Sequence, residues 1–270
     1  MVRLPRLAYS HPIRSVGVVF GVILLAVFLQ DVVRLPVIVL EPALIDLERI
    51  ETTGIGIRTL FLTLNFIGMA MAGVFYLWLT DRGWDWLDLD RPGKSEVLWI
   101  LGGIGLLIAF YIVFNVVVTI LELPAQDNQI IHILGDDVRM ILLMIGIVFF
   151  FNAPAEEFLY RNIVQKRLYA GFGGPAAVVL ASLLFTLIHV PAFLTVEGGL
   201  QGAAVTLVFI FGGAIVFGFL YYQTSNLWVP IAVHAIINAF QLSLYLLFVL
   251  AGLEEEVQTA VIWTLFIAVP

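Results

Sequence analysis

A cluster of charged residues interrupts one of the most apolar parts of the chain. Residues 140–152 are almost wholly apolar, and Glu156, Glu157 and Arg161 follow them. A charged side chain in the middle of a membrane helix costs about 2.5–3.5 kcal/mol on insertion scales, so ionisable residues there are functional candidates by default. The four-residue spacing of Glu157 and Arg161 places both on one helix face, where the two charges can pair.

Two further polar pairs have the same helical spacing. Phe185 lies four residues before His189, His234 lies four residues before Asn238, and Asn152 lies one turn before the glutamates. Residues four apart lie on the same side of a helix. Each pair can therefore present both of its side chains to one neighbouring helix.

An acid and two imidazoles support two kinds of hydrolytic chemistry. Glu156, His189 and His234 form a ligand set that can hold a divalent metal such as zinc and leave a position open for water. Alternatively, a carboxylate acts as the general base toward a water while the histidines stabilise the oxyanion. The sequence leaves both mechanisms open. The His-Glu-x-x-His signature of soluble zinc proteases is absent.

The spacing around a turn predicts that these groups meet at one depth. The glycine- and proline-rich residues 171–175 indicate a turn between two antiparallel helices. Glu157 lies sixteen residues before Gly173 and His189 lies sixteen after it. At 1.5 Å per residue, both lie on the order of 20 Å from the tip of the hairpin. His234 is a few residues inside a later apolar stretch, so it can join them.

The composition is that of an integral membrane protein. Of 270 residues, 61% are hydrophobic and 12% are charged, whereas soluble domains carry about 25% charged residues. The absence of cysteine excludes disulfides and thiolate metal sites. The net charge of −7 argues against nucleic-acid binding, which requires a basic face. Eleven arginines against two lysines, with acidic loops, hint at a prokaryotic source.

Eight stretches are apolar and about long enough to be transmembrane helices. They are Ile13–Gln30, Ile57–Thr80, Glu96–Leu121, Val138–Leu159, Ala176–Leu194, Ala203–Tyr222, Trp228–Leu250 and Val257–Pro270. The last is short for a full span. We expect a single all-α transmembrane domain over residues 1–270, with three spans that carry no motif in 1–137 and the catalytic core in 138–250.

The basic residues predict the orientation. Arginine and lysine gather in the N-terminal tail and in the second and fourth loops, whereas the first loop is long and acidic. By the positive-inside rule, the N-terminus and the even-numbered loops lie in the cytoplasm. No small-residue cleavage site follows Ile13–Gln30, so we expect it to be an uncleaved first span in the plasma membrane.

Residues 151–240 resemble the CAAX prenyl protease type II and bacteriocin-processing (CPBP, or Abi) family of intramembrane proteases. The family signature is Glu-Glu-x-x-x-Arg, then Phe-x-x-x-His, then His-x-x-x-Asn. This sequence has the three elements in that order at residues 156–161, 185–189 and 234–238. One departure is Asn162, where the family commonly has glycine.

The resemblance implies a bundle of eight transmembrane helices with an intramembrane cavity open toward the cytoplasm and the membrane. The substrate that it implies is a membrane-bound or lipidated peptide, including a prenylated one. The implied roles are activation of water by Glu156, completion of the water or metal site by His189 and His234, an oxyanion contact from Asn238, support of the geometry by Glu157 and Arg161, and a pocket wall from Phe185. Which glutamate is the base stays open.

Two other functions compete with a protease. A membrane scaffold or bacteriocin-immunity-type protein could use the polar cluster only to hold its helices together. A transporter or proton relay also places carboxylates and histidines inside the membrane. The sequence shows no repeated pair of broken helices, which disfavours the transporter.

Overall fold

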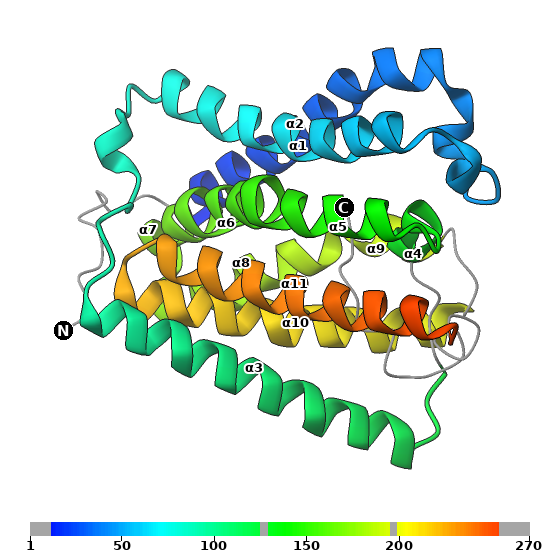
Figure 1. The fold of residues 1–270 in the computed structure, drawn as a ribbon. Coiled ribbons are helices and arrows are strands. Elements are labelled where there is room, and N and C mark those ends of the chain that lie inside the picture. The colour runs from blue at the N-terminus through cyan, green and yellow to red at the C-terminus, as the bar shows by residue number, and fades with distance from the viewer. Residues whose placement is uncertain (1–11, 125–128, 195–198, 254–270) are drawn as a thin grey trace.

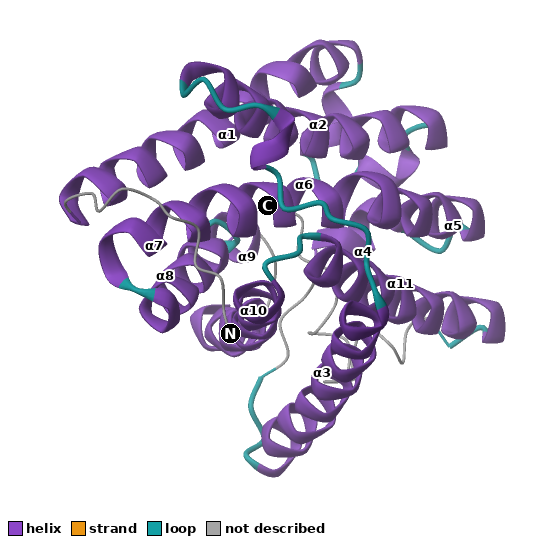
Figure 2. Cartoon of the chain, turned by 90° about the vertical axis from the view of Figure 1, so that its left-hand side faces the viewer, coloured by secondary structure: helices purple, strands orange, loops and turns teal. Residues whose placement is uncertain are grey.

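The chain folds into a bundle of helices, and the helix that carries Glu156 and Glu157 lies in the middle of it. The structure is a computed structural model that describes residues 12–124, 129–194 and 199–253, and no strand occurs among them. The glutamate-bearing helix lies between the pair α1–α2 on one side and α10–α11 on the other (Figure 1). The view turned by 90° shows α3 at the outer edge, next to α10 and α11 (Figure 2).

Six helices of the described part are long and apolar enough to cross a membrane. They are α1 (Pro12–Leu40), α2 (Ile55–Leu79), α3 (Lys94–Ile120), the composite helix Val138–Phe172, α10 (Gly199–Thr224) and α11 (Trp228–Ala251). Six of the predicted spans are thereby confirmed. The predicted eighth span, Val257–Pro270, lies outside the described residues, so the total of eight stays a prediction.

The predicted span Ala176–Leu194 is divided into two shorter helices. They are α8 (Gly174–Leu187) and α9 (Val190–Leu194). Pro191 has no N–H to donate to the carbonyl of Leu187, four residues earlier, so a regular helix cannot continue through this point. A 14-residue helix is about 21 Å long, which is shorter than the hydrocarbon layer of about 30 Å. The predicted span Ala176–Leu194 is therefore interrupted after Leu187, and whether its two parts cross the membrane together stays a prediction.

Short elements connect these helices. They are η1 (Pro42–Ile45) and η2 (Ile50–Thr52) between α1 and α2, η3 (Trp84–Trp86) between α2 and α3, and α4 (Gln129–Leu134) before the composite helix.

The composite helix alternates between α-helical and π-helical segments. Its parts are α5 (Val138–Ile147), the π-helix η4 (Val148–Asn152), α6 (Ala153–Glu157), the π-helix η5 (Phe158–Gln165) and α7 (Lys166–Phe172). Pro154 lacks an N–H, and the Ala153 N–H before it bonds the carbonyl of Val148, five residues back. Such wide turns occur often at functional sites. Here they flank the two glutamates on both sides.

The predicted hairpin between α7 and α8 is confirmed. Gly173 separates the two helices and has φ +67°, a conformation that favours glycine. At the next position, a Cβ on Gly174 would collide with the ring of Tyr222. The turn therefore depends on two glycines for different reasons, one conformational and one steric.

Gly68 lets α1 and α2 approach closely. A Cβ at Gly68 would lie 2.6 Å from the Cα of Gln30 and 2.8 Å from the carbonyl oxygen of Leu29, which are both backbone atoms of α1. We expect Gly68→Ala to lower the free energy of unfolding by about 1–3 kcal/mol, because the backbone must shift. Thermal unfolding in detergent measures this. Gly102→Ala in α3 is the matched control, because an added Cβ there would meet no atom of another segment within 4 Å. This variant should not lower the stability of the protein. Equal unfolding midpoints for the two variants would contradict the close approach.

Candidate active site

Four polar side chains of the composite helix are buried together inside the bundle. Asn152, Glu156, Glu157 and Arg161 have at most 1% of their surface exposed. Buried charges persist in proteins only when they are paired or hydrogen-bonded. The hydrogen-bond partners of each carboxylate therefore indicate whether it can accept a proton from water.

Both oxygens of Glu157 are already paired. Its Oε2 accepts a hydrogen bond from the Arg161 Nε at 3.0 Å, as the spacing of the two residues predicts. Its Oε1 lies 2.8 Å from the Nδ1 of His234, which comes from α11. With a carboxylate as the acceptor, Nδ1 is the donor and carries the hydrogen. Glu157 thus orients the imidazole of His234, and each of its oxygens already has a hydrogen-bond partner.

Glu156 is paired at one oxygen. Its Oε1 accepts a hydrogen bond from the Asn152 Nδ2 at 2.7 Å. Its Oε2 lies 3.7 Å from the Nε2 of His234, which is beyond hydrogen-bond distance. A water between two polar atoms separated by such a distance can bond to both. The two adjacent carboxylates therefore differ in their environment, a difference that the sequence left open.

Asn238 is connected to Glu156 through Asn152. The Nδ2 of Asn238 donates to the Oδ1 of Asn152 at 3.2 Å, while the other end of the Asn152 amide bonds Glu156. Asn238 and His234 lie one turn apart on α11 and both contact the composite helix, which confirms that they share a helix face. The amide of Asn238 has a second N–H that can donate to a bound oxygen.

His189 is joined to this group through aromatic rings. Its Nδ1 lies 2.7 Å from the carbonyl oxygen of Phe185, so Nδ1 is the donor and a neutral ring has its lone pair on Nε2. The rings of Phe185 and His189 are 4.8 Å apart, and the Arg161 guanidinium lies 5.5 Å from the centre of the Phe185 ring. The Phe185 ring also packs nearly perpendicular to the Tyr160 ring, with the ring centroids 4.9 Å apart. A direct contact between His189 and a glutamate stays a prediction.

Phe217 in α10 contributes a contact that the sequence analysis missed. Its ring stacks on the imidazole of His234 with centroids 4.6 Å apart and an interplanar angle of 13°. The stack contacts the face of the His234 ring, while the hydrogen bond with Glu157 is made at its edge, so the two contacts together fix the orientation of the ring. One phenylalanine among 21 gives no sequence signal for such a role.

The side chains as placed do not form a metal site. Within residues 12–124, 129–194 and 199–253, no group of three or more His, Asp or Glu side chains lies close enough to hold a metal ion. Of the three predicted ligands, Glu156 and His234 are 3.7 Å apart, and His189 makes the carbonyl contact at Nδ1 that ligating histidines often make. The choice between the metal and the metal-free mechanism, which the sequence left open, is a matter for experiment.

The loop that follows η3 is hydrogen-bonded to the composite helix and to α10 near the site. Asp88, which follows η3, accepts hydrogen bonds from the Lys166 ammonium at 2.9 Å and from the Tyr221 hydroxyl. Tyr221 also accepts a hydrogen bond from the Asn162 Nδ2 at 3.2 Å. Asn162, the departure from the family pattern, therefore ties the helix beside Arg161 to α10 and to this loop.

Backbone carbonyls of the same loop complete the attachment. Lys166 donates to the carbonyl of Trp86 at 2.7 Å, and its ammonium lies 4.2 Å from the centre of the Trp86 ring. The Leu227 N–H donates to the carbonyl of Asp88, and the Asn226 side chain donates to the carbonyl of Asp90 at 2.9 Å. The loop thus links the composite helix to the start of α11, which carries His234.

Removing the Lys166 ammonium should destabilise this end of the bundle. The Lys166→Met variant leaves the Trp86 carbonyl and one site on Asp88 without a donor, so we expect a loss of about 1–3 kcal/mol in the free energy of unfolding. Denaturant unfolding in detergent measures it. Lys94→Met, at an exposed position at the start of α3, is the control and should change stability by less than about 0.5 kcal/mol. Equal stability of the two variants would show that the loop is not held by Lys166.

Comparison with known proteins confirms the resemblance seen in the motifs. Residues 138–240 match the family described as "Type II CAAX prenyl endopeptidase Rce1-like". This range begins with α5 and contains all the residues of the buried cluster.

A curated relative covers a larger part of the chain. The membrane-embedded CAAX protease MroQ of Staphylococcus aureus (strain USA300) is 24% identical over 165 residues. The match covers 57% of this chain and 60% of the length of the relative. No solved structure matches the chain significantly.

Proposed function

Because residues 138–240 match the Rce1-like type II CAAX prenyl endopeptidases, we propose that this chain is an intramembrane endopeptidase that uses an activated water. The observation that carries this proposal is the asymmetry of the glutamate pair. Glu157 is bonded at both oxygens, whereas Glu156 is bonded at one and faces His234 with the other. A general base needs an oxygen within reach of the proton that it removes. Glu156 meets that requirement.

The reaction begins with a water between Glu156 and His234. The water donates one hydrogen bond to the Oε2 of Glu156 and one to the Nε2 of His234, so its lone pairs point away from both acceptors and toward the substrate. Glu157 keeps the hydrogen of His234 on Nδ1, which leaves Nε2 as an acceptor. As the water oxygen bonds to the carbonyl carbon, Glu156 takes the proton.

Collapse of the tetrahedral intermediate completes the hydrolysis. The second N–H of Asn238 donates to the oxyanion, while Asn152 holds the Asn238 amide in position. Glu156 then gives its proton to the nitrogen of the leaving peptide as the C–N bond breaks. In this proposal His189 completes the water site. It lies beside Phe185, whose ring forms a wall of the substrate pocket.

The substrate class follows from where the site lies. The glutamates are buried inside a helix long enough to cross the bilayer, which supports a substrate peptide that is held at the membrane. We propose a lipidated peptide, with a prenylated C-terminal peptide as the first candidate. The N-terminus and the α7–α8 turn lie on the cytoplasmic side in this proposal, since basic residues gather at that end.

Peptide cleavage by the purified chain tests the proposal. Fluorogenic peptides with and without a farnesyl group are incubated with the protein in bilayer vesicles, each with and without a chelator. We expect cleavage of the farnesylated peptide that is unaffected by the chelator. Activity lost to chelator and restored by zinc would replace the water mechanism with a metal mechanism. No cleavage of either peptide would favour the scaffold.

A further inference from the structure

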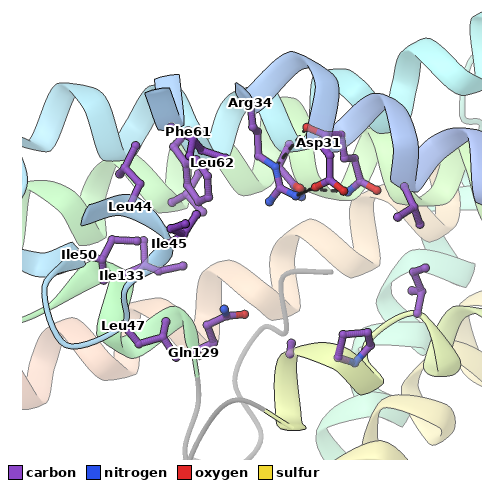
Figure 3. Close-up of a pocket in the computed structure, with 17 residues that line it drawn as sticks. Asp31, Arg34, Leu44, Ile45, Leu47, Ile50, Phe61, Leu62, Gln129 and Ile133 are labelled. Atoms are coloured by element: carbon purple, nitrogen blue, oxygen red, sulfur yellow. Dashed lines mark hydrogen bonds and ion pairs between the residues drawn. The ribbon is translucent and has the colours of Figure 1, made fainter. Parts of the chain in front are cut away.

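A cavity lies at the end of the bundle away from the α7–α8 turn. Its volume is about 420 Å³, within the range of about 300–1,000 Å³ that ligand sites occupy. Residues of α1, α2, α4 and α9 and of the segment between α1 and α2 line it, together with Ile188 between α8 and α9. Figure 3 shows the apolar side chains of Leu44, Phe61, Leu62 and Ile133 gathered on one side of it. None of the catalytic candidates lines this cavity.

A buried amide in the cavity wall has an unused donor. Asn65 is fully buried and lines the cavity. Its Oδ1 accepts a hydrogen bond from the Gln30 Nε2 at 3.1 Å, but its Nδ2 has no hydrogen-bond partner. A buried donor without a partner lowers the stability of the folded state. An acceptor oxygen of a ligand in the cavity would remove this cost.

Opposite charges lie side by side next to this amide. The Nη2 of Arg34 pairs with the Oδ1 of Asp31 at 2.6 Å, and the guanidinium lies 5.2 Å from the centre of the Phe61 ring (Figure 3). The Asp31 side chain is 68% exposed, so its second oxygen is accessible. A cation and an anion in this arrangement suit a zwitterion better than a simple anion, which Asp31 would repel.

From Val27 to Arg34, the order of groups along α1 matches the order of groups in a phospholipid. This part of the helix presents apolar Val27, then the Gln30–Asn65 amide pair, then Asp31 and Arg34, over about 10 Å, and apolar Ile38 lines the cavity one turn later. An acyl chain, an ester carbonyl and a charged headgroup follow one another in the same way. The 29 residues of α1 span about 43 Å, which equals the bilayer with its headgroup regions. Arg34 lies six residues from the end of α1, near the headgroup level.

We propose that this cavity binds a glycerophospholipid with an ammonium headgroup, such as phosphatidylethanolamine. The ester carbonyl accepts from the Asn65 Nδ2, the phosphate binds Arg34 and the ammonium binds Asp31. One acyl chain runs past Val27 toward Pro191 in α9, while the other remains in the bilayer. This site is separate from the Glu156 cluster, so its test measures binding and does not depend on peptidase activity.

Lipid binding to the purified full chain in detergent tests the amide contact. Native mass spectrometry with a dioleoyl-phosphatidylethanolamine titration gives the dissociation constant. The double variant Gln30→Met/Asn65→Leu replaces both amides by apolar side chains of similar size, and we expect about tenfold weaker binding. Asn115→Leu removes an amide in α3 outside the cavity and should bind as the wild type does. Wild-type affinity in the double variant would overturn the proposal.

A second experiment tests the headgroup contacts. It needs no substitution of a fully buried residue. Dioleoyl-phosphatidylglycerol has the phosphate and lacks the ammonium, so we expect it to bind the wild type several-fold more weakly than phosphatidylethanolamine. In Asp31→Asn this preference should disappear. An unchanged preference would overturn the headgroup assignment even where the double variant does not fold. Displacement of the lipid by a farnesylated peptide, one for one, would instead identify the cavity as part of the substrate site.

Discussion

Glu156→Gln should abolish peptide hydrolysis and leave the fold intact. The amide oxygen of glutamine can still accept the hydrogen bond from Asn152, but an amide cannot take a proton from water. General-base catalysis contributes roughly 10²–10⁴-fold, so we expect a fall of that size in the turnover number. The rate of farnesylated-peptide cleavage in vesicles and the unfolding midpoint in detergent are measured on the same preparation.

The neighbouring glutamate and a distant one serve as controls for this substitution. Glu48→Gln changes an exposed position in the segment between α1 and α2 and should keep full activity. Glu157→Gln should lower both activity and stability, because Glu157 supports Arg161 and His234. Full turnover in Glu156→Gln, with loss of activity only in Glu157→Gln, would show that the roles of the two carboxylates are exchanged.

Arg161→Met should destabilise the protein more than any other single change considered above. Arg161 and Glu157 are both fully buried, and removing the arginine leaves an uncompensated carboxylate in the bundle. Breaking a buried ion pair from one side costs about 3–5 kcal/mol. Chemical unfolding in detergent, monitored by circular dichroism, gives the change. Arg14→Met, at an exposed position in the first turn of α1, should have an effect below about 0.5 kcal/mol.

A double substitution separates the loss of charge pairing from the loss of packing. In Arg161→Met/Glu157→Gln the unpaired charge is absent, so part of the lost stability should return. A double variant that is as unstable as the single one would mean that packing of the arginine side chain, for example over Phe185, is what matters. Stability equal to the wild type in the single variant would contradict the buried pair itself.

The features that local spacing specifies could be predicted from the sequence. A separation of four residues was sufficient to pair Glu157 with Arg161 and to place His234 and Asn238 on one face. Glycine-rich residues 171–175 were sufficient to predict the α7–α8 hairpin. Apolar length identified most of the spans because a membrane helix must satisfy its own backbone hydrogen bonds.

Features that depend on packing between distant segments could not be predicted. Adjacent glutamates point about 100° apart on a helix, and only the positions of Asn152 and His234 distinguish Glu156 from Glu157. Asp88 binds Lys166 across 78 residues of sequence, and an acidic residue in a polar loop gives no indication of that contact. Pro154 accounts for the π-helical segment before it, but the sequence has no comparable signal for η5, and helical periodicity reveals neither.

The most direct test of the account is a single-turnover reaction in ¹⁸O-labelled water. Excess purified wild-type protein in vesicles is mixed with a farnesylated peptide, quenched in acid and analysed by mass spectrometry. Direct attack by the water between Glu156 and His234 predicts one ¹⁸O atom in the new carboxylate and no peptide covalently attached to the protein at any time point. A peptide–protein adduct that forms and decays, or a peptide that stays intact, would contradict it.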